Sequence, residues 1–283
     1  LFVGSVKCLK ETGAGRDVVL CVRTPFDRLV VTDAAGEREV PVRIVADAKD
    51  VGVADWVLVT TKAQDTASAE PWFRTLVGPR TRVVVVQNGV GQAERARPHL
   101  PDGVTVLPAI IYCSVERTAP GRITHHGSTR MSVPAGADGS AFAALFAGTP
   151  FEITQEADFV TVAWRKLLSN AVVNPITALT LRRIVVFDDP AIQDLARGLM
   201  AEVIRVANAE GARLTEEDVT RILDSYRRIS GDGGSSMLYD RLAGRPLEHA
   251  HLTGAVVSAA ERHGIDVPLN RAILALAGAA SAR

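Results

Sequence analysis

Three polar side chains recur at intervals of four residues in the stretch WRKLLSNAVVNPITAL, which begins at Trp164. They belong to Lys166, Asn170 and Asn174. Residues four apart lie nearly above one another on a helix, so one face would present an ammonium group and two carboxamides. The residues between them are mostly apolar, and asparagine is a poor residue for a helix interior. The stretch therefore predicts a helix that binds a small polar molecule; the alternative is a solvated polar stripe.

The composition points to a small partner. The 283 residues suffice for two ordinary domains, each with its own core. The 32 basic residues balance the 32 acidic ones, so no broad positive field favours nucleic acid or an anionic membrane. No apolar run reaches the roughly 18 residues that span a bilayer, and the first residues show no secretory signal pattern. We therefore predict a soluble, cytoplasmic protein.

The sequence predicts no metal site. The three cysteines form no Cys-x-x-Cys pair, and their odd number gives no disulfide framework. His249 and His251 are two positions apart, a spacing that turns side chains in different directions on a helix. His125 and His126 have no ligand residues next to them in the sequence.

Residues 1–156 predict a doubly wound α/β domain of the Rossmann type. Short β-branched runs alternate there with helix-length connections, a pattern typical of a parallel sheet with helices on both faces. The expected strands cover residues 17–22, 40–45, 56–61, 82–87 and 104–111.

Two further strands, over residues 122–126 and 130–133, are expected to pair antiparallel at the sheet edge. A helix over 140–147 and a strand near Phe151 would complete this domain. Residues 157–283 show long stretches of helical period and predict an all-α second domain. Its last helix should begin at Pro268, with Asp266 as candidate N-cap.

The first four residues fit the end of a Gly-x-Gly-x-x-Gly dinucleotide fingerprint, with Gly4 as the third glycine. A helix over residues 5–12 would follow, and the central strand and the first two glycines would be absent. Because a doubly wound sheet without its central strand exposes apolar edges, we expect further residues before Leu1 in the working protein. The alternative for Gly4 is an ordinary helix–sheet packing contact.

Polar residues follow three of the expected strands, at the ends where open parallel sheets bind ligands. Arg23 follows the second strand and offers a guanidinium to a 2′-phosphate, which favours NADPH over NADH; the alternative is a surface arginine. Lys62 and Asn88 follow two later strands. The pair Asn88-Gly89 is equally compatible with an ordinary turn.

The chain resembles the ketopantoate reductase family, whose NADPH-dependent members reduce 2-dehydropantoate to pantoate in pantothenate biosynthesis. The resemblance runs almost end to end and rests on the order and spacing of several motifs. These are Thr61 to Ala63, QNGVGQ from Gln87, PGRITHHG from Pro120, the stretch from Trp164, SSMLYD from Ser235, Glu248 and VPLNRAI from Val267.

The resemblance implies a Rossmann domain, a helical domain and an active site in the cleft between them. It implies that Lys166 and Glu248 are catalytic, with Glu248 also holding the substrate hydroxyls. The implied substrate-binding residues are Lys62, Asn170, Asn174 and Ser236, the last on the substrate carboxylate. Lys62 and Asn88 are also implied to bind the cofactor beside the nicotinamide, which adds to Gly4 and Arg23, the cofactor-binding residues predicted above from their positions. A homodimer is a further possibility.

The expected reaction is hydride transfer from NADPH to the carbonyl carbon of a 2-keto acid. Negative charge then develops on the keto oxygen, and Lys166 would stabilise and protonate it. One ammonium group can do both, because the proton that stabilises the charge also neutralises it.

Two departures from the family pattern leave the substrate open. Gly233 stands where the family often has asparagine, and the residues after Glu248 differ from the usual motif. The alternatives are a paralogue acting on another 2-keto acid, a 3-hydroxyacid dehydrogenase and a non-catalytic NADPH-binding sensor. The Gln-Asn-Gly motif and the spacing from Ser236 to Glu248 favour the keto-acid reductase.

Overall fold

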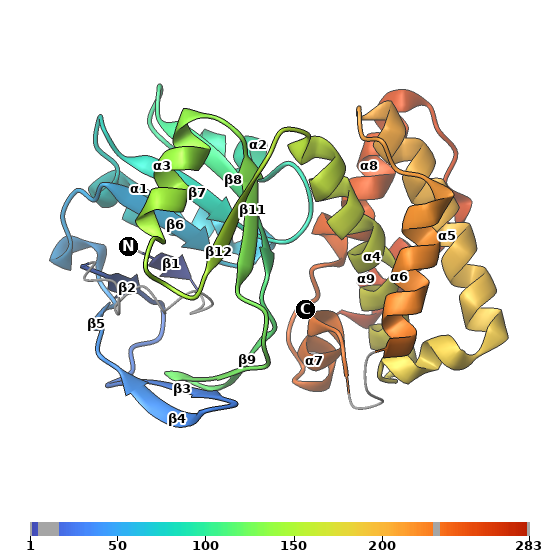
Figure 1. Cartoon of the computed structure of the whole chain (residues 1–283), viewed down its shortest axis with the longest axis horizontal. Helices are drawn as coiled ribbons and strands as arrows, with labels where there is room; N and C mark the ends of the chain where they lie inside the picture. Colours follow the sequence, from blue (N-terminus) through green and yellow to red (C-terminus); the bar gives the residue numbers. More distant parts are fainter. Residues whose placement is uncertain (1, 5–16, 229–232, 282–283) are drawn as a thin grey trace. The chain divides into compact units, whose positions relative to one another are not determined.

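The chain forms two compact units, Leu1–Phe159 and Val160–Arg283, in a computed structural model (Figure 1). The structure describes residues 2–4, 17–228 and 233–281. Unit 1 is a mixed α/β unit and unit 2 is helical. None of the helices in the described part of the chain combines the length and hydropathy that a bilayer crossing requires.

Unit 1 is built on an eight-stranded sheet in the order β12-β11-β8-β7-β6-β1-β2-β5. Every neighbouring pair from β8 to β5 is parallel, whereas β11 runs antiparallel to β8. The chain leaves β1 on one side and returns on the other, which is the order of a doubly wound sheet. The predicted fold class is confirmed. The strands are β1 (Phe2–Gly4), β2 (Val19–Cys21), β5 (Arg43–Val45), β6 (Trp56–Thr60), β7 (Arg82–Val86), β8 (Thr105–Tyr112), β11 (Arg130–Pro134) and β12 (Glu152–Glu156).

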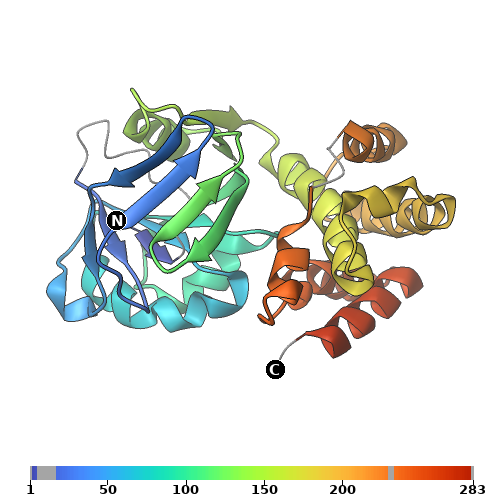
Figure 2. The ribbon, with the colours of Figure 1, turned by 90° about the horizontal axis from the view of Figure 1, so that it is seen from below.

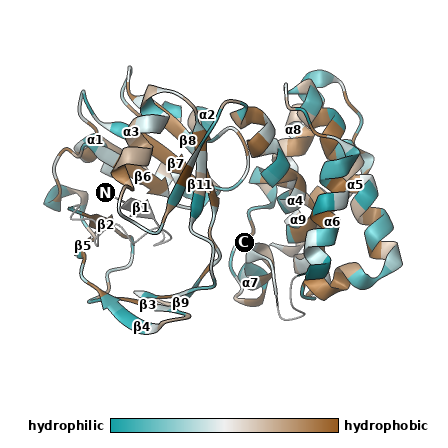
Figure 3. Cartoon of the chain, viewed as in Figure 1, coloured by the Kyte–Doolittle hydropathy of each residue, from teal (hydrophilic) through white to brown (hydrophobic). Residues whose placement is uncertain are grey.

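The two faces of this sheet belong to two separate hydrophobic cores. Alternate residues of a strand point to opposite faces, so Val83 and Val84 of β7, both fully buried, lie in different cores. Phe73 packs in one core and Phe142 in the other. The strand β7 is correspondingly brown in Figure 3. The helices that supply these and other core residues are α1 (Glu70–Leu76), α2 (Gln92–Ala96) and α3 (Ala137–Leu145).

The expectation that the central strand is absent is wrong. Phe2–Gly4 forms β1, which pairs with β2 on one side and β6 on the other. Apolar and aromatic residues suit a strand, and the two flanking strands provide partners for its backbone groups. Gly4 is therefore the last residue of a strand and does not lie inside a helix. The helix expected over residues 5–12 lies outside the described residues.

A second, four-stranded sheet has the order β4-β3-β10-β9 (Figure 2). It brings the blue strands β3 and β4 beside the green strands β9 and β10, and its buried residues join the core that contains Phe142. Its edge strand β4 is teal in Figure 3 because it carries hydrophilic residues, and its side chains are largely exposed. The strands are β3 (Leu29–Asp33), β4 (Gly36–Val40), β9 (Val115–Ala119) and β10 (Arg122–His125).

The expected pairing of residues 122–126 with residues 130–133 is wrong. Strand β10 pairs with β9 and β3, while β11 pairs with β8 and β12. The physical reason lies in the turn before β10. Gly121 has φ +71°, and a side chain there would collide with the carbonyl oxygen of Arg28. This glycine turns β9 into β10 as a hairpin.

The run expected over residues 40–45 is also divided. Pro41 has no N–H for a sheet ladder, and it separates β4 from β5.

Unit 2 surrounds the helix α4 (Phe159–Thr180), most of whose residues are buried. The prediction of a helical second region is confirmed. The other helices are η5 (Ile184–Asp188), α5 (Pro190–Ala209), α6 (Glu216–Arg228), α7 (Ser236–Leu242), η6 (His249–His251), α8 (Thr253–His263) and α9 (Pro268–Ala280).

The cap of α9 differs from the expected one. Pro268 does open the helix, but Val267 occupies the N-cap position and Asp266 does not. The first free N–H groups of the helix are satisfied by Glu202 of α5. Its carboxylate, buried at 4% exposure, accepts from Leu269 N at 3.0 Å and from Asn270 N at 2.9 Å. A carboxylate from a distant helix thus replaces the local cap.

Glu202→Gln should lower the free energy of unfolding by about 2 to 4 kcal/mol, because the change removes a buried charge-assisted acceptor. Urea denaturation followed by circular dichroism measures the effect. Glu261→Gln is the matched control, since Glu261 pairs with Arg271 at the surface and its loss should cost under about 0.5 kcal/mol. Equal stability of the two variants would show that Glu202 does not cap α9.

Candidate active site

Lys62 and Asn88 lie at the ends of two neighbouring parallel strands. Lys62 follows β6 and precedes the short helix η3 (Ala63–Ala69), and Asn88 follows β7. Because β6 and β7 pair in parallel, their carboxyl ends meet at one edge of the sheet, where doubly wound folds bind ligands. Both side chains are partly buried.

Gln87 ties these two strand ends together. Its side chain, 3% exposed, donates from Nε2 to Thr61 Oγ1 at 3.0 Å and to Thr66 Oγ1 at 2.9 Å. Its Oε1 accepts from Arg95 Nε at 3.2 Å. The buried carboxamide of Gln87, the residue before Asn88, therefore bonds both to Thr61, the residue before Lys62, and to Arg95 of the helix α2. Sequence reasoning did not single out Gln87 as a site residue, although its place in the QNG motif was the available signal.

The segment after Asn88 has a backbone that only glycine adopts readily. Gly89 has φ +90° and Gly91 has φ +69°, in the left-handed region that disfavours side chains. The side-chain amide of Gln92 bonds to this segment and donates to Gly89 O at 2.9 Å and to Gln87 O at 3.3 Å. The result is a tight, hydrogen-bonded entry into α2.

Arg23 lies at the same edge of the sheet, two residues after the end of β2. Its side chain is exposed, and its Nη2 pairs with Asp65 Oδ2 of η3 at 3.2 Å. The guanidinium is thus held in place by a carboxylate that comes from the segment after β6. Gly4 ends β1, the strand between β2 and β6.

In unit 2, Lys166, Asn170 and Asn174 lie on α4, as their spacing predicts. Lys166 is partly buried, whereas Asn170 and Asn174 are 8% and 3% exposed. The alternative of a solvated polar stripe does not fit this burial. Two carboxamides inside a helical unit must find polar partners or face a polar ligand.

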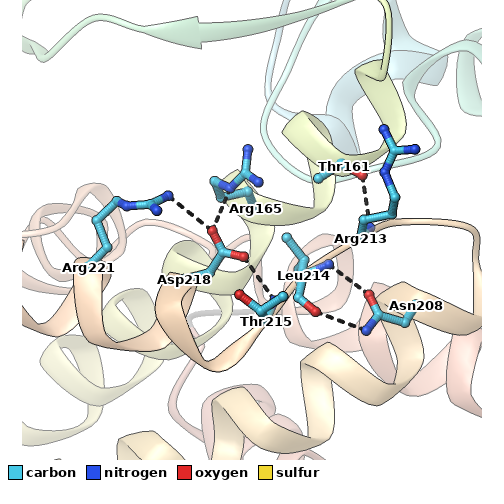
Figure 4. A network of polar contacts seen from close by, with 8 residues as sticks. All are labelled: Thr161, Arg165, Asn208, Arg213, Leu214, Thr215, Asp218 and Arg221. Atoms are coloured by element: carbon cyan, nitrogen blue, oxygen red, sulfur yellow. Dashed lines mark hydrogen bonds and ion pairs between the residues drawn. The ribbon is translucent and has the colours of Figure 1, made fainter.

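Hydrogen bonds from α6 hold α4 on another side (Figure 4). Asp218, whose side chain is 5% exposed, accepts from Arg165 Nε at 2.8 Å and from Arg221 Nη1 at 3.3 Å. Tyr226 lies 2.9 Å from the hydroxyl of Ser169, and burial raises the pKa of this tyrosine. Arg165 and Ser169 directly precede Lys166 and Asn170, so these bonds fix the rotation of α4 about its axis.

The segment before α7 is joined to α4 by a hydroxyl pair. Ser235 Oγ lies 2.7 Å from Thr177 Oγ1 and caps α7 by accepting from Leu238 N at 3.1 Å. Ser236, the predicted carboxylate ligand, is the exposed first residue of α7. Sequence reasoning missed the role of Ser235, although a serine just before a helix is a common N-cap signal. This contact brings the predicted Ser236 to the helix that carries the predicted asparagines.

Glu248 is 7% exposed and lies directly before the short helix η6. Its carbonyl oxygen accepts from His251 N at 3.0 Å and Leu252 N at 3.1 Å, so its backbone is fixed at the entry to η6. His249 Nδ1 lies 3.1 Å from Leu247 O.

The residues that the structure describes contain no group of three His, Cys, Asp or Glu side chains that could hold a metal ion. Cys21, in β2, is a free thiol, and burial raises its pKa to about 12. Burial thus keeps this thiol protonated near neutral pH and makes it a poor nucleophile.

The residues at the edge of the large sheet fit a dinucleotide. A guanidinium follows β2, an ammonium group follows β6 and a carboxamide follows β7. The left-handed glycines add a backbone that a ligand can approach closely. The edge lies at the point where the strand order reverses, which is where such folds hold nucleotides.

Two family models match the chain. The model described as Ketopantoate reductase PanE/ApbA matches residues 3–138, and the one described as Ketopantoate reductase PanE/ApbA C terminal matches residues 158–281. A 2-dehydropantoate 2-reductase of Caulobacter vibrioides is 37% identical over 266 residues, which cover 93% of this chain and 90% of that protein. The same enzyme name belongs to a Mycobacterium tuberculosis protein that is 37% identical over 270 residues, covering 95% and 91% of the two chains.

A solved structure also matches the whole chain. It is a dimeric ketopantoate reductase from Staphylococcus aureus, with a TM-score of 0.89 and 25% sequence identity. The match covers 99% of this chain and 97% of that one.

Gln87→Leu should weaken the binding of a pyridine nucleotide roughly ten-fold, because loss of the carboxamide leaves the ends of β6 and β7 without their shared hydrogen bonds. Quenching of intrinsic fluorescence on NADPH titration measures this. Gln64→Leu is the matched control, because Gln64 is an exposed residue of η3 and its loss should leave the affinity unchanged. Unaltered NADPH affinity in Gln87→Leu would contradict the role given to this network.

Proposed function

We infer the activity of this protein from its family: the chain belongs to the ketopantoate reductase family, and we propose that it reduces 2-dehydropantoate to pantoate. The predicted family is confirmed, and with it the predicted class of enzyme, an oxidoreductase. The observation that carries the proposal is the chain-long identity of 37% to proteins named 2-dehydropantoate 2-reductase. The arrangement of Lys166, Asn170 and Asn174 on α4 supports it.

NADPH is the proposed cofactor. The family fold and the polar edge of the sheet suit a pyridine nucleotide, and the guanidinium of Arg23 favours the form with a 2′-phosphate. Lys62 and Asn88 would hold the nicotinamide end, and Gly4, proposed as the third glycine of the fingerprint, would belong to the cofactor-binding segment. When bound, the reduced nicotinamide supplies a hydride to the carbonyl carbon of the substrate.

Lys166 is the proposed proton donor. As negative charge develops on the keto oxygen, the ammonium group stabilises it by a charge-assisted hydrogen bond and then transfers its proton to form the hydroxyl. The proton and the hydride together convert a ketone to an alcohol, so the reaction balances. The hydrogen bonds of Arg165 and Ser169 to α6 hold the helix so that this amine needs little reorientation.

The remaining residues of unit 2 have proposed binding roles. Asn170 and Asn174 would bind the substrate, and Asn170 would also orient the ammonium group. Ser236 would bind the substrate carboxylate and Glu248 its hydroxyls, which places Glu248 with Lys166 among the proposed catalytic residues. The hydroxyl pair of Ser235 and Thr177 supports the position of Ser236 relative to α4.

Gly233 gives weight to a second candidate substrate. A carboxamide often stands at this position in the family, and its absence here leaves room for a 2-keto acid with a different side chain. A homodimer is proposed as the assembly, by analogy with the dimeric Staphylococcus aureus enzyme.

The protein should oxidise NADPH when 2-dehydropantoate is added, with a kcat/KM at least ten-fold above that for 2-ketoisovalerate, because Ser236 and Glu248 are proposed to bind the carboxylate and the hydroxyl together. Loss of absorbance at 340 nm, the standard signal of the reduced nicotinamide, measures the rate. A higher kcat/KM for another 2-keto acid would assign the paralogous activity. Absence of turnover with every keto acid, despite NADPH binding, would leave only the non-catalytic sensor.

Lys166→Ala should lower kcat by roughly 10²- to 10⁴-fold, the usual contribution of a positioned general acid, while NADPH affinity stays within about two-fold. Stopped-flow single-turnover rates, together with a binding titration, separate these quantities. Lys49→Ala is the matched control, because Lys49 is exposed on the short helix η2 (Ala48–Asp50) of unit 1. Turnover that survives in Lys166→Ala would refute the proton-donor role.

A further inference from the structure

The ion pair between Arg23 and Asp65 crosses the end of β1. Arg23 follows β2 and Asp65 follows β6, and these two strands flank β1 in the sheet. All three run in parallel, so the pair lies at the carboxyl edge, where the strand order reverses. This is the position at which a doubly wound fold recognises the ribose of a bound nucleotide.

The carboxylate of Asp65 is the more buried member of the pair. Its side chain is 29% exposed, against 74% for Arg23. Its backbone is anchored in η3, where Asp65 N donates to Lys62 O at 2.9 Å and Asp65 O accepts from Ser68 Oγ at 2.6 Å. The Arg23 side chain is the more exposed of the two, so we take the position of the Asp65 carboxylate to determine that of the guanidinium.

We propose that Asp65 sets the discrimination between phosphorylated and unphosphorylated dinucleotides by opposing the positive charge of Arg23. This inference rests on the proposed function, in which Arg23 meets the 2′-phosphate. In the usual arrangement a carboxylate at the end of the second strand accepts from the ribose 2′-hydroxyl. Here an arginine follows the second strand, and the segment after β6, on the other side of β1, supplies the carboxylate through η3.

The two charges act in opposite directions on the two nucleotides. A 2′-phosphate gains from the guanidinium and is repelled by the carboxylate beside it, whereas a 2′-hydroxyl can donate to that carboxylate. With both charges present, the carboxylate reduces the preference of the guanidinium for the phosphorylated form. Without the carboxylate, the guanidinium acts alone and the phosphorylated form gains.

Binding of adenosine nucleotides without a nicotinamide tests this apart from turnover. Calorimetric Kd values for 2′,5′-ADP and 5′-AMP give a discrimination ratio, Kd of 5′-AMP over Kd of 2′,5′-ADP. Asp65→Asn should raise this ratio roughly two- to five-fold at low salt, the range expected for one exposed charge pair. The gain should shrink as ionic strength rises. An unchanged or lower ratio in Asp65→Asn overturns the proposal.

Two further variants make the outcome specific. Asp102→Asn, a change at an exposed carboxylate after the helix η4 (Arg97–His99), should leave the ratio unchanged, and an equal rise there would reduce the effect to net charge and overturn the role of Asp65. Arg23→Ala should lower the ratio below that of the unaltered protein, because the carboxylate of Asp65 then acts alone. A ratio that falls in Arg23→Ala but does not move in Asp65→Asn defeats the inference about Asp65 alone. A ratio unmoved by Arg23→Ala defeats both, because the proposed NADPH site then lies elsewhere.

Discussion

Parallel pairing of neighbouring strands is the constraint on which the nucleotide unit depends. Because β2, β1, β6 and β7 run in one direction, the residues that follow them emerge at one edge. Arg23, Lys62 and Asn88 are far apart in sequence and reach that edge from three different strands. Gln87 then joins the ends of β6 and β7 by hydrogen bonds, which converts a shared edge into a fixed arrangement. A slip in strand register would separate these groups.

In the helical unit the corresponding constraint is the rotation of α4. Helical spacing alone places Lys166, Asn170 and Asn174 on one face, but it does not decide which way that face turns. The buried Asp218 and Tyr226 of α6 hold the adjacent residues Arg165 and Ser169, and Ser235 bonds to Thr177 near the end of the helix. These contacts rigidify the scaffold of the proposed proton donor, so that its ammonium group need not be ordered anew in each turnover.

The sequence supplied most of the architecture, because the features that define it are local. Short β-branched runs predict the buried parallel strands, and the spacing of four residues predicts which side chains share one face of α4. The pairing of β10 could not be read in this way, because its partner β3 lies some ninety residues earlier and a hairpin turn at Gly121 competes with the edge pairing. The cap of α9 could not be predicted for the same reason, since Glu202 lies 67 residues from Leu269 in the sequence. Nor could the partner of Arg23, since Asp65 is 42 residues away.

The residues of the candidate site fall into the same two groups, those in local sequence patterns and those that act through contacts between distant segments. The positions of Lys62, Asn88, Lys166 and the two asparagines, after strands and on one helix, were predictable because each stands in a short motif or spacing. The residues that hold them, such as Gln87 and Ser235, act through contacts between segments, and no local pattern states those contacts. Supporting residues are therefore the part of an active site for which a structure is required.

The most direct test of the account follows an atom through the reaction. NADPH that carries deuterium at C4 of the nicotinamide would be incubated with the protein and 2-dehydropantoate, and the product examined by mass spectrometry and nuclear magnetic resonance. The account predicts pantoate with a single deuterium on the carbon that bore the keto oxygen, and a hydroxyl proton from solvent. Pantoate without deuterium, or no pantoate while NADPH remains bound and unoxidised, would contradict it.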